Sequence, residues 1–285
     1  MGYKTILVHA DLSRHATARI ELAAAICAEQ GSHLIGAAMM GVSPSVFPKG
    51  YNVGPGTVLA PYFEPLEQGA RRALDNFAAI AARYGVTHES RLVCDDVPDG
   101  LALLARFADL VVVSQDDPGE SLGYTPPAAR MPDYVVYNAA RPVLVVPNVL
   151  NMPHGSPPGA PRRVLLCWNG SREASVAMAA SVPLLRRATH VSLAVFAPAV
   201  APDCASEHEL ADAQAFLARH AVHAQVVLRD PGPDTGRAIL QLAAEGGCDL
   251  VVMGCYGHSQ FHELLLGGAS RTVLQEAPLL VLMAR

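Results

Sequence analysis

Two segments in the second half of the chain carry residues whose types and spacing suit a phosphorylated ligand. The first is Asn169-Gly170-Ser171, which directly follows an apolar run. The second follows another apolar run and precedes an expected helix; its small residues are Gly254, Gly257, Gly267, Gly268 and Ser270. Glycines let the backbone approach a phosphate closely, and a helix start offers free N–H groups. Ser270 adds a hydroxyl donor, so the pattern predicts an anion cradle.

The same glycines also suit a purely structural role. A tight turn and a closely packed helix would need glycine at these places without any ligand. The order of expected elements favours ligand binding, because strand, glycine turn, short insert, double glycine and helix follow one another. In parallel α/β sheets, ligands bind outside the carboxyl ends of the strands, where both segments are expected.

An internal repeat indicates which elements position these residues. Three blocks recur in the same order in the two halves, with shorter loops in the second copy: 5–14 with 164–172, 108–113 with 248–253, and 141–146 with 277–282. Asp11 then matches Asn169, and Ser13 matches Ser171. We expect Ser13 and Ser171 to be helix N-caps, since each follows a strand directly.

Each half alternates apolar runs with helical segments. In the first half we expect strands at 3–10, 33–40, 88–94, 109–114 and 142–147, and helices at 13–30, 66–84, 98–107 and 132–140. Nearly continuous Val, Ile and Leu runs are typical of parallel strands covered by helices on both faces. The sequence therefore predicts the α/β class: two tandem domains, each with a mostly parallel five-stranded sheet covered by helices on both faces.

Proline and glycine mark the expected boundaries. The first domain is predicted at 1–148 and the second at 162–285, and a linker rich in Pro and Gly joins them at 149–161. A second irregular stretch, Gly41–Pro65, interrupts the first domain; it is either a functional lid or a mobile excursion.

On these motifs the chain resembles the universal stress protein family. That family has G-x2-G-x9-G after its fourth strand, which Gly254, Gly257 and Gly267 match. Its first strand ends in Asp-Gly-Ser, which is similar to Asn169-Gly170-Ser171 and, less closely, to Asp11-Leu12-Ser13. The resemblance covers both halves apart from the linker and the Gly41–Pro65 stretch. It implies two Rossmann-like (adenine nucleotide alpha hydrolase-like) domains that form an intramolecular pseudo-dimer in which the last strands (142–146 and 278–283) pair. It also implies a further homodimer.

The resemblance also implies ATP or a related adenine nucleotide, with Mg²⁺ accompanying it as the only expected metal. By position, Asn169 would face the base or ribose, and Met253 and Gly254 would border the ring and sugar. The residues expected around the phosphates are Gly257, Gly267, Gly268 and Ser270, with His258 as a further candidate contact. Two departures, Gly268 in place of Ser or Thr and Asn169 in place of Asp, predict weakened binding.

The first half lacks the glycine pair at the matching place. It carries instead Asp116, Asp117 and Glu120, whose negative charge would repel a phosphate. We therefore expect a degenerate first pocket whose domain serves as a structural partner.

Bulk composition excludes several classes of protein. A net charge of -5 and a pI near 6.1 argue against a nucleic-acid binder. The apolar runs are too short and interrupted to span a bilayer. Six cysteines without a C-x-x-C pair indicate reduced thiols and a cytoplasmic location.

Other tempting residues have plainer interpretations. His258 and His262 are spaced as metal ligands on a helix would be, although no H-E-x-x-H pattern is present. The adjacent Asp95 and Asp96 are expected to point to opposite faces of a strand, which disfavours a shared site. Trp168 is expected to be a core residue.

Three functions follow from the sequence. The first is a nucleotide-binding stress-response or regulatory protein, and the second is an interaction module with a vestigial pocket and an unidentified regulatory protein as its partner. The third is an enzyme acting on a nucleotide. The sequence has no Walker-type lysine, nucleophile elbow or evident general base, so we expect no enzyme beyond slow ATP hydrolysis.

Overall fold

The structure is a computed structural model that describes residues 2–42, 60–117, 119–120, 131–148, 159, 161–197, 207–255 and 268–285. The chain divides into two compact units. One contains the described residues of Gly2–Arg141, and the other those of Pro142–Ser156 and Ala160–Arg285.

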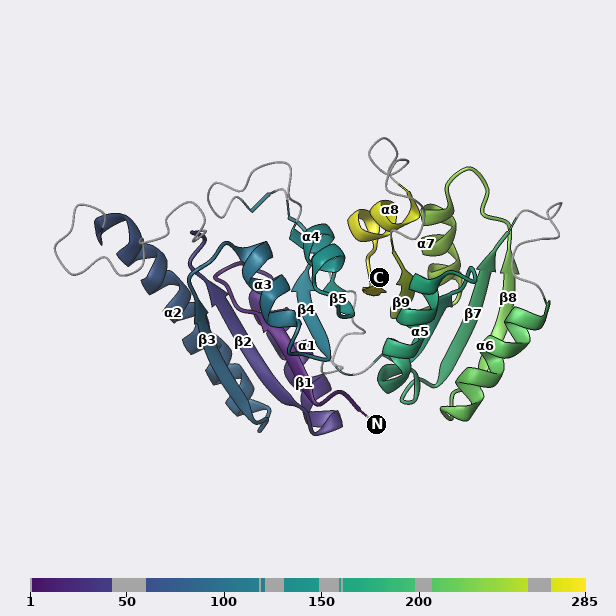
Figure 1. The fold of residues 1–285 in the computed structure, drawn as a ribbon, viewed down its shortest axis with the longest axis horizontal. Coiled ribbons are helices and arrows are strands. Elements are labelled where there is room, and N and C mark those ends of the chain that lie inside the picture. Colours follow the sequence, from purple (N-terminus) through teal and green to yellow (C-terminus); the bar gives the residue numbers. More distant parts are fainter. Residues whose placement is uncertain are drawn as a thin grey trace. The chain divides into compact units, whose positions relative to one another are not determined.

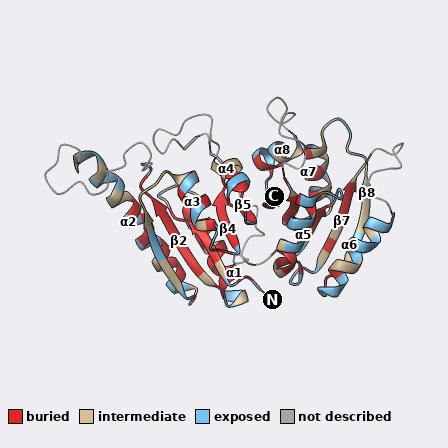
Figure 2. Ribbon diagram, in the orientation of Figure 1, coloured by how far each residue is buried: buried red, intermediate tan, exposed pale blue. Residues whose placement is uncertain are grey.

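The first unit alternates four strands with four helices. In chain order these are β1 (Thr5–His9), α1 (Ala16–Gln30), β2 (His33–Met39), α2 (Ala60–Arg83), β3 (His88–Val93), α3 (Val97–Ala105), β4 (Leu110–Ser114) and α4 (Met131–Asn138). The strands run parallel in the order β3-β2-β1-β4, and Leu7 of β1 lies level with Ile35 of β2 and Val111 of β4. β4 and nearly all of β1 are buried, as Figure 2 shows, so β1 and β4 form the centre of the core.

The second unit begins with a short strand and then repeats the alternation. Its elements are β5 (Val143–Val146), β6 (Arg163–Cys167), α5 (Arg172–Leu185), β7 (His190–Phe196), α6 (Glu207–Arg219), β8 (Ala224–Arg229), α7 (Thr235–Glu245), β9 (Leu250–Gly254), α8 (Ala269–Glu276) and β10 (Leu280–Ala284). The strand order is β5-β10-β9-β6-β7-β8. β5 runs antiparallel to β10, with Val145 level with Val281, and the other strands are parallel to their neighbours. The predicted pairing of the two last strands is thus confirmed.

The helices of each unit pack against one another and against the sheet. In the first unit α1 and α2 pack together on one face of the sheet, and α3 and α4 pack together on the other face (Figure 1). In the second unit α7 packs with α8, while α5 lies against β9 and β10. The predicted fold class is confirmed, since parallel strands covered by helices build both units.

The repeat is visible in how each unit anchors its first strand. Asp109, just before β4, accepts hydrogen bonds from the backbone N–H groups of Lys4 (2.7 Å) and Thr5 (2.9 Å). Asp249, just before β9, accepts them in the same way from Arg162 (2.8 Å) and Arg163 (3.0 Å). The same carboxylate therefore holds the first strand beside the fourth in both units.

Two predicted helix starts are wrong. α1 begins at Ala16 with His15 as its N-cap, and no side chain caps it. Ser13 is not the N-cap, because α1 begins only three residues later, at Ala16. α2 begins at Ala60, so the irregular stretch expected to end at Pro65 ends earlier, and residues 43–59 of it lie outside the described residues.

The expectation for Asp95 and Asp96 is also wrong. β3 ends at Val93, so neither aspartate lies in a strand. Asp96 is the N-cap of α3 and accepts a hydrogen bond from the backbone N–H of Asp99 (3.0 Å). Carboxylate oxygens of Asp95, Asp96 and Asp99 lie within 4.8 Å of one another, because a turn brings together side chains that an extended strand would separate.

The predicted domain boundaries stay a prediction, since most of the 149–161 linker lies outside the described residues. Within the described parts of the chain, every cysteine is free. Among the helices described, none has the length and apolar character needed to cross a membrane.

Candidate functional site

The candidate site of the second unit lies where the strand order reverses. β7 and β8 extend the sheet on one side of β6, and β9 and β10 extend it on the other. The carboxyl ends of β6 and β9 are therefore neighbours at a topological switch point, the usual place for a ligand in an open α/β sheet. The predicted segment Asn169–Ser171 follows β6, and Met253 and Gly254 end β9. The structure thus brings these two segments to one edge.

Asn169 and Ser171 shape the start of α5. The side-chain oxygen of Asn169 accepts hydrogen bonds from the backbone N–H (3.2 Å) and hydroxyl (2.7 Å) of Ser171. The Ser171 hydroxyl accepts in turn from the N–H of Ala174 (3.1 Å), which confirms Ser171 as the N-cap. Gly170 between them has φ +73°, a left-handed conformation that favours glycine. Asn169 is exposed, and its amide N–H₂ group takes no part in this turn.

Gly254 and Met253 have structural explanations. A Cβ added at Gly254 would lie 2.4 Å from the backbone nitrogen of Ala174, so glycine allows the start of α5 to pack directly against the end of β9. Met253 is 6% exposed, and its side chain belongs to the core. Only the backbone of Met253 is left to border a ligand.

The start of α8 is the best-placed anion-binding group among the described residues. Gly268 is its N-cap and has no side chain that could cap the helix, and no side chain of the described residues hydrogen-bonds to the first N–H groups. Gly268 is exposed, and a Cβ built there would meet nothing within 4 Å. Ser270 lies in the first turn and is half-buried. Uncapped N–H groups at a helix start attract phosphate oxygens.

Four predicted candidates cannot be placed on this edge. Gly257, His258, His262 and Gly267 lie outside the described residues, and their roles stay predictions.

Acidic side chains surround the start of α5. Glu173 in its first turn is largely buried and pairs with Arg172 (3.1 Å). The Glu209 carboxylate of α6 would lie 3.7 Å from a Cβ at Gly170. A helix start that already has a serine cap and a carboxylate is a poor place for phosphate. The α8 start therefore suits the phosphates, and the exposed Asn169 suits an uncharged part of a ligand.

The first unit has the same turn after β1 as the second unit has after β6, but a buried arginine side chain fills the space beside it. The carboxylate of Asp11 accepts hydrogen bonds from the backbone N–H (3.1 Å) and hydroxyl (2.6 Å) of Ser13, the same pattern as at Asn169 and Ser171. Arg19 of α1, which is 1% exposed, points to this turn. It donates hydrogen bonds to Asp11 (2.8 Å), to the carbonyl of His9 (2.9 Å) and to the hydroxyl of Ser114 (2.6 Å).

Sequence reasoning missed Arg19. The position that the repeat matches to it is Ala177, which is fully buried. Similarly, Ser114 corresponds to Gly254. The sequence contains one sign of this contact. The two oppositely charged residues of the first half, Asp11 and Arg19, correspond to two uncharged residues, Asn169 and Ala177, in the second.

Burial and ionic contacts shift the pKa values of Asp11 and His9. Burial alone would raise the pKa of Asp11, but His9, Arg19 and Ser13 together hold it well below its usual range. The pKa of His9 is lowered to about 4: burial lowers it most, Asp11 opposes this, and Arg19 adds to the lowering. His9 is therefore neutral at pH 7, with Nδ1 lying 3.3 Å from Asp11.

A second ionic group lies at the carboxyl end of β4. Asp117 accepts hydrogen bonds from His15 (2.7 Å) and Arg14 (2.9 Å), which hold its pKa well below the usual range. Glu120 accepts one from the backbone N–H of Arg14 (2.7 Å). The negative charge expected here is present, and Arg14 neutralises part of it. Exclusion of phosphate from this edge stays a prediction.

The comparison with protein families decides the relationship of the second half. The model of the Universal stress protein family matches residues 162–285. These residues belong to the universal stress protein family. The switch-point edge of β6 and β9 is thus the edge of a universal stress protein domain, and the predicted family resemblance is confirmed there.

Solved structures extend the likeness in fold to the whole chain. A universal stress protein from Archaeoglobus fulgidus DSM 4304 is similar over 99% of this chain and 96% of its own, with a TM-score of 0.72 and 14% identity. A functionally unknown protein from Pseudomonas aeruginosa PAO1 is similar over 99% and 92%, with a TM-score of 0.58 and 17% identity. At such identities the likeness shows the fold. Among curated protein sequences, none matches this chain.

Proposed function

We propose that the universal stress protein domain binds ATP or a related adenine nucleotide and that the chain is a cytoplasmic stress-response or regulatory protein. One observation carries the proposal. The switch-point edge combines an exposed amide at Asn169 with a helix start at Gly268 that no side chain of the described residues caps. An amide can both donate to and accept from a base or ribose, and the α8 start can hold phosphates. Mg²⁺ would accompany the nucleotide phosphates.

The first test identifies the ligand. Protein freshly purified and then denatured should release an adenine nucleotide, in at most one equivalent per chain, that mass spectrometry detects. ATP added to ligand-free protein should bind with the same limit.

The second test locates the phosphates at α8. Gly268 has φ −67° and open space around it, so Gly268→Asp and Gly268→Asn both fit without strain. Both side chains can cap α8, and Asp favours the helix electrostatically. Only Asp adds a negative charge beside a bound phosphate. At roughly 5 Å each charge pair costs about 1 to 3 kcal/mol, or about 5- to 200-fold in affinity. ATP should bind Gly268→Asn much more tightly than Gly268→Asp. Equal affinities in a titration calorimeter would refute a phosphate at this helix.

We also propose that the first unit binds no nucleotide at its matching edge and acts as the structural partner of the second. Two features support this proposal: Arg19 fills the space behind the turn, and the negative charges of Asp117 and Glu120 at the carboxyl end of β4 would repel a phosphate. A Gly257→Ala/Gly267→Ala double variant should then lose all ATP binding. One equivalent of ATP still bound by that variant would contradict the proposal.

A further inference from the structure

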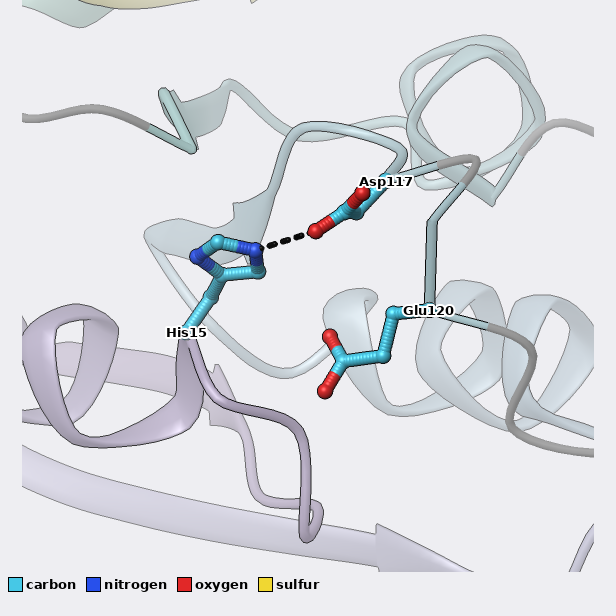
Figure 3. A group of neighbouring side chains, drawn as sticks. All are labelled: His15, Asp117 and Glu120. Carbon is cyan, nitrogen blue, oxygen red and sulfur yellow. Dashed lines mark hydrogen bonds and ion pairs between the residues drawn. The ribbon is translucent and has the colours of Figure 1, made fainter.

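Three side chains at the carboxyl end of β4 form a group suited to a metal ion. They are His15, Asp117 and Glu120, hereafter the acid–histidine cluster. One donor atom from each lies within 4.8 Å of the others, and all three are half-buried. Figure 3 shows the imidazole and both carboxylates directed toward a common space. The cluster belongs wholly to the first unit and is separate from the nucleotide edge proposed for the second.

The donor set has a definite metal preference. An imidazole nitrogen with two carboxylates suits Mn²⁺, Fe²⁺ or Zn²⁺, and no thiolate is involved. A cation with bonds of about 2.1 Å keeps its donor atoms about 3 to 3.5 Å apart. His15 and Asp117 now lie 2.7 Å apart, so a cation needs only a small opening between them.

The cluster already attracts a positive group. The Arg14 guanidinium donates to the same Asp117 oxygen that accepts from His15. The Arg14 side chain is 64% exposed, so it can leave toward solvent without disturbing the core. The other Asp117 oxygen accepts from the N–H of Gly119 (2.9 Å), and this bond fixes the carboxylate in the orientation that a ligand needs.

Backbone contacts hold the remaining ligands in register. Glu120 accepts a hydrogen bond from the backbone N–H of Arg14, and this bond does not depend on the Arg14 side chain. His15 is the N-cap residue of α1, so its backbone is fixed by the helix. From these contacts we propose that the acid–histidine cluster binds one divalent transition-metal cation, which displaces the Arg14 guanidinium from Asp117.

The test uses Mn²⁺ and the full chain, since Mn²⁺ prefers oxygen and nitrogen donors over the cysteine thiolates. Titration followed by electron paramagnetic resonance should show one saturable site. Asp117→Asn and Glu120→Gln should each weaken binding by about tenfold or more. Pulsed measurements should show coupling of Mn²⁺ to a histidine nitrogen, and His15→Gln should abolish this coupling. That spectroscopic signature keeps the test valid if a ligand variant is poorly folded.

Arg14→Gln separates this proposal from loose binding to surface carboxylates. The variant keeps the backbone contact to Glu120 and removes the competing positive charge, so Mn²⁺ should bind about tenfold more tightly. Asp95→Asn, in the other carboxylate cluster, is the matched control and should leave the affinity unchanged. The proposal is overturned if no site saturates, if Arg14→Gln fails to strengthen binding, or if Asp95→Asn abolishes it while Asp117→Asn does not.

Discussion

Replacing Arg19 by alanine should destabilise the first unit more than any surface change. The Arg19 side chain is 1% exposed and ends in three hydrogen bonds, one of them to the Asp11 carboxylate. Arg19→Ala removes the cation and leaves a carboxylate that is only 20% exposed. Breaking a buried ion pair on one side typically costs about 3 to 5 kcal/mol, because the remaining charge stays desolvated. We expect a loss of that size in the free energy of unfolding of this unit.

The second half of the chain suggests a second substitution that should offset part of this loss. Asn169 and Ala177 occupy there the positions of Asp11 and Arg19, and neither of them carries a charge. The double variant Asp11→Asn/Arg19→Ala should therefore be about 1 to 3 kcal/mol more stable than Arg19→Ala alone. It should stay less stable than the wild type, because the space of the arginine side chain is left unfilled.

Hydrogen exchange of the β1 and β4 amides is the suitable assay. Two units need not unfold together, so a single unfolding curve gives no free energy for one of them. The only tryptophan, Trp168, lies in the other unit and provides a separate signal that should not change. Arg83→Ala is the control, since it breaks a surface pair with Glu21 worth under about 1 kcal/mol. The reasoning is refuted if Arg19→Ala costs no more than this control, or if the double variant is less stable than the single one.

Three further predictions concern single residues. The pKa of His9 falls from 6.5 to about 4 on folding, so between these pH values the unfolded chain binds a proton that the folded chain does not. The free energy of unfolding of the first unit should therefore fall by about 3 kcal/mol as the pH is lowered from 6.5 to 4. Hydrogen exchange should show this loss of stability in the wild type and not in His9→Gln. Gly254→Ala places a methyl group against the backbone of Ala174 and should cost about 1 to 3 kcal/mol, measured by urea unfolding followed at Trp168; a neutral result would contradict the close packing. Ser171→Ala removes the N-cap of α5 and should cost about 1 kcal/mol in the same assay, whereas no loss would deny the cap a role.

Much of the fold was predictable because its signals are local. Apolar runs mark the strands in the sequence, and the internal repeat aligns β1 with β6 and β4 with β9. The helix starts were harder. Asp11-Leu12-Ser13 and Asn169-Gly170-Ser171 form the same turn, yet only Ser171 caps a helix. The sequence pattern could not separate them, because the difference depends on how α1 is held by residues elsewhere in the chain.

The least predictable feature was the burial of a charge. In the sequence, Arg19 lies within a helix of mostly small and apolar residues, where an arginine normally extends to solvent. Its partners at His9, Asp11 and Ser114 come from two strand ends, and Ser114 is 95 residues away. Only a three-dimensional arrangement brings these groups together. The position of the candidate nucleotide edge was predictable, because ligands bind at the switch point of such a sheet. The packing role of Gly254 was not, because it depends on the close approach of α5 to the end of β9.

The residue differences between the two halves depend on one another, so a single substitution cannot convert one site into the other. In the first unit a serine ends β4, and Arg19 occupies the space beside it and neutralises Asp11. In the second unit Gly254 ends β9, so the start of α5 packs against the strand and leaves no room for an arginine. An asparagine then replaces the aspartate, because no cation remains to balance its charge. Placing glycines in the first unit would therefore leave a buried arginine and an acidic entrance, and it would not by itself create a nucleotide site there.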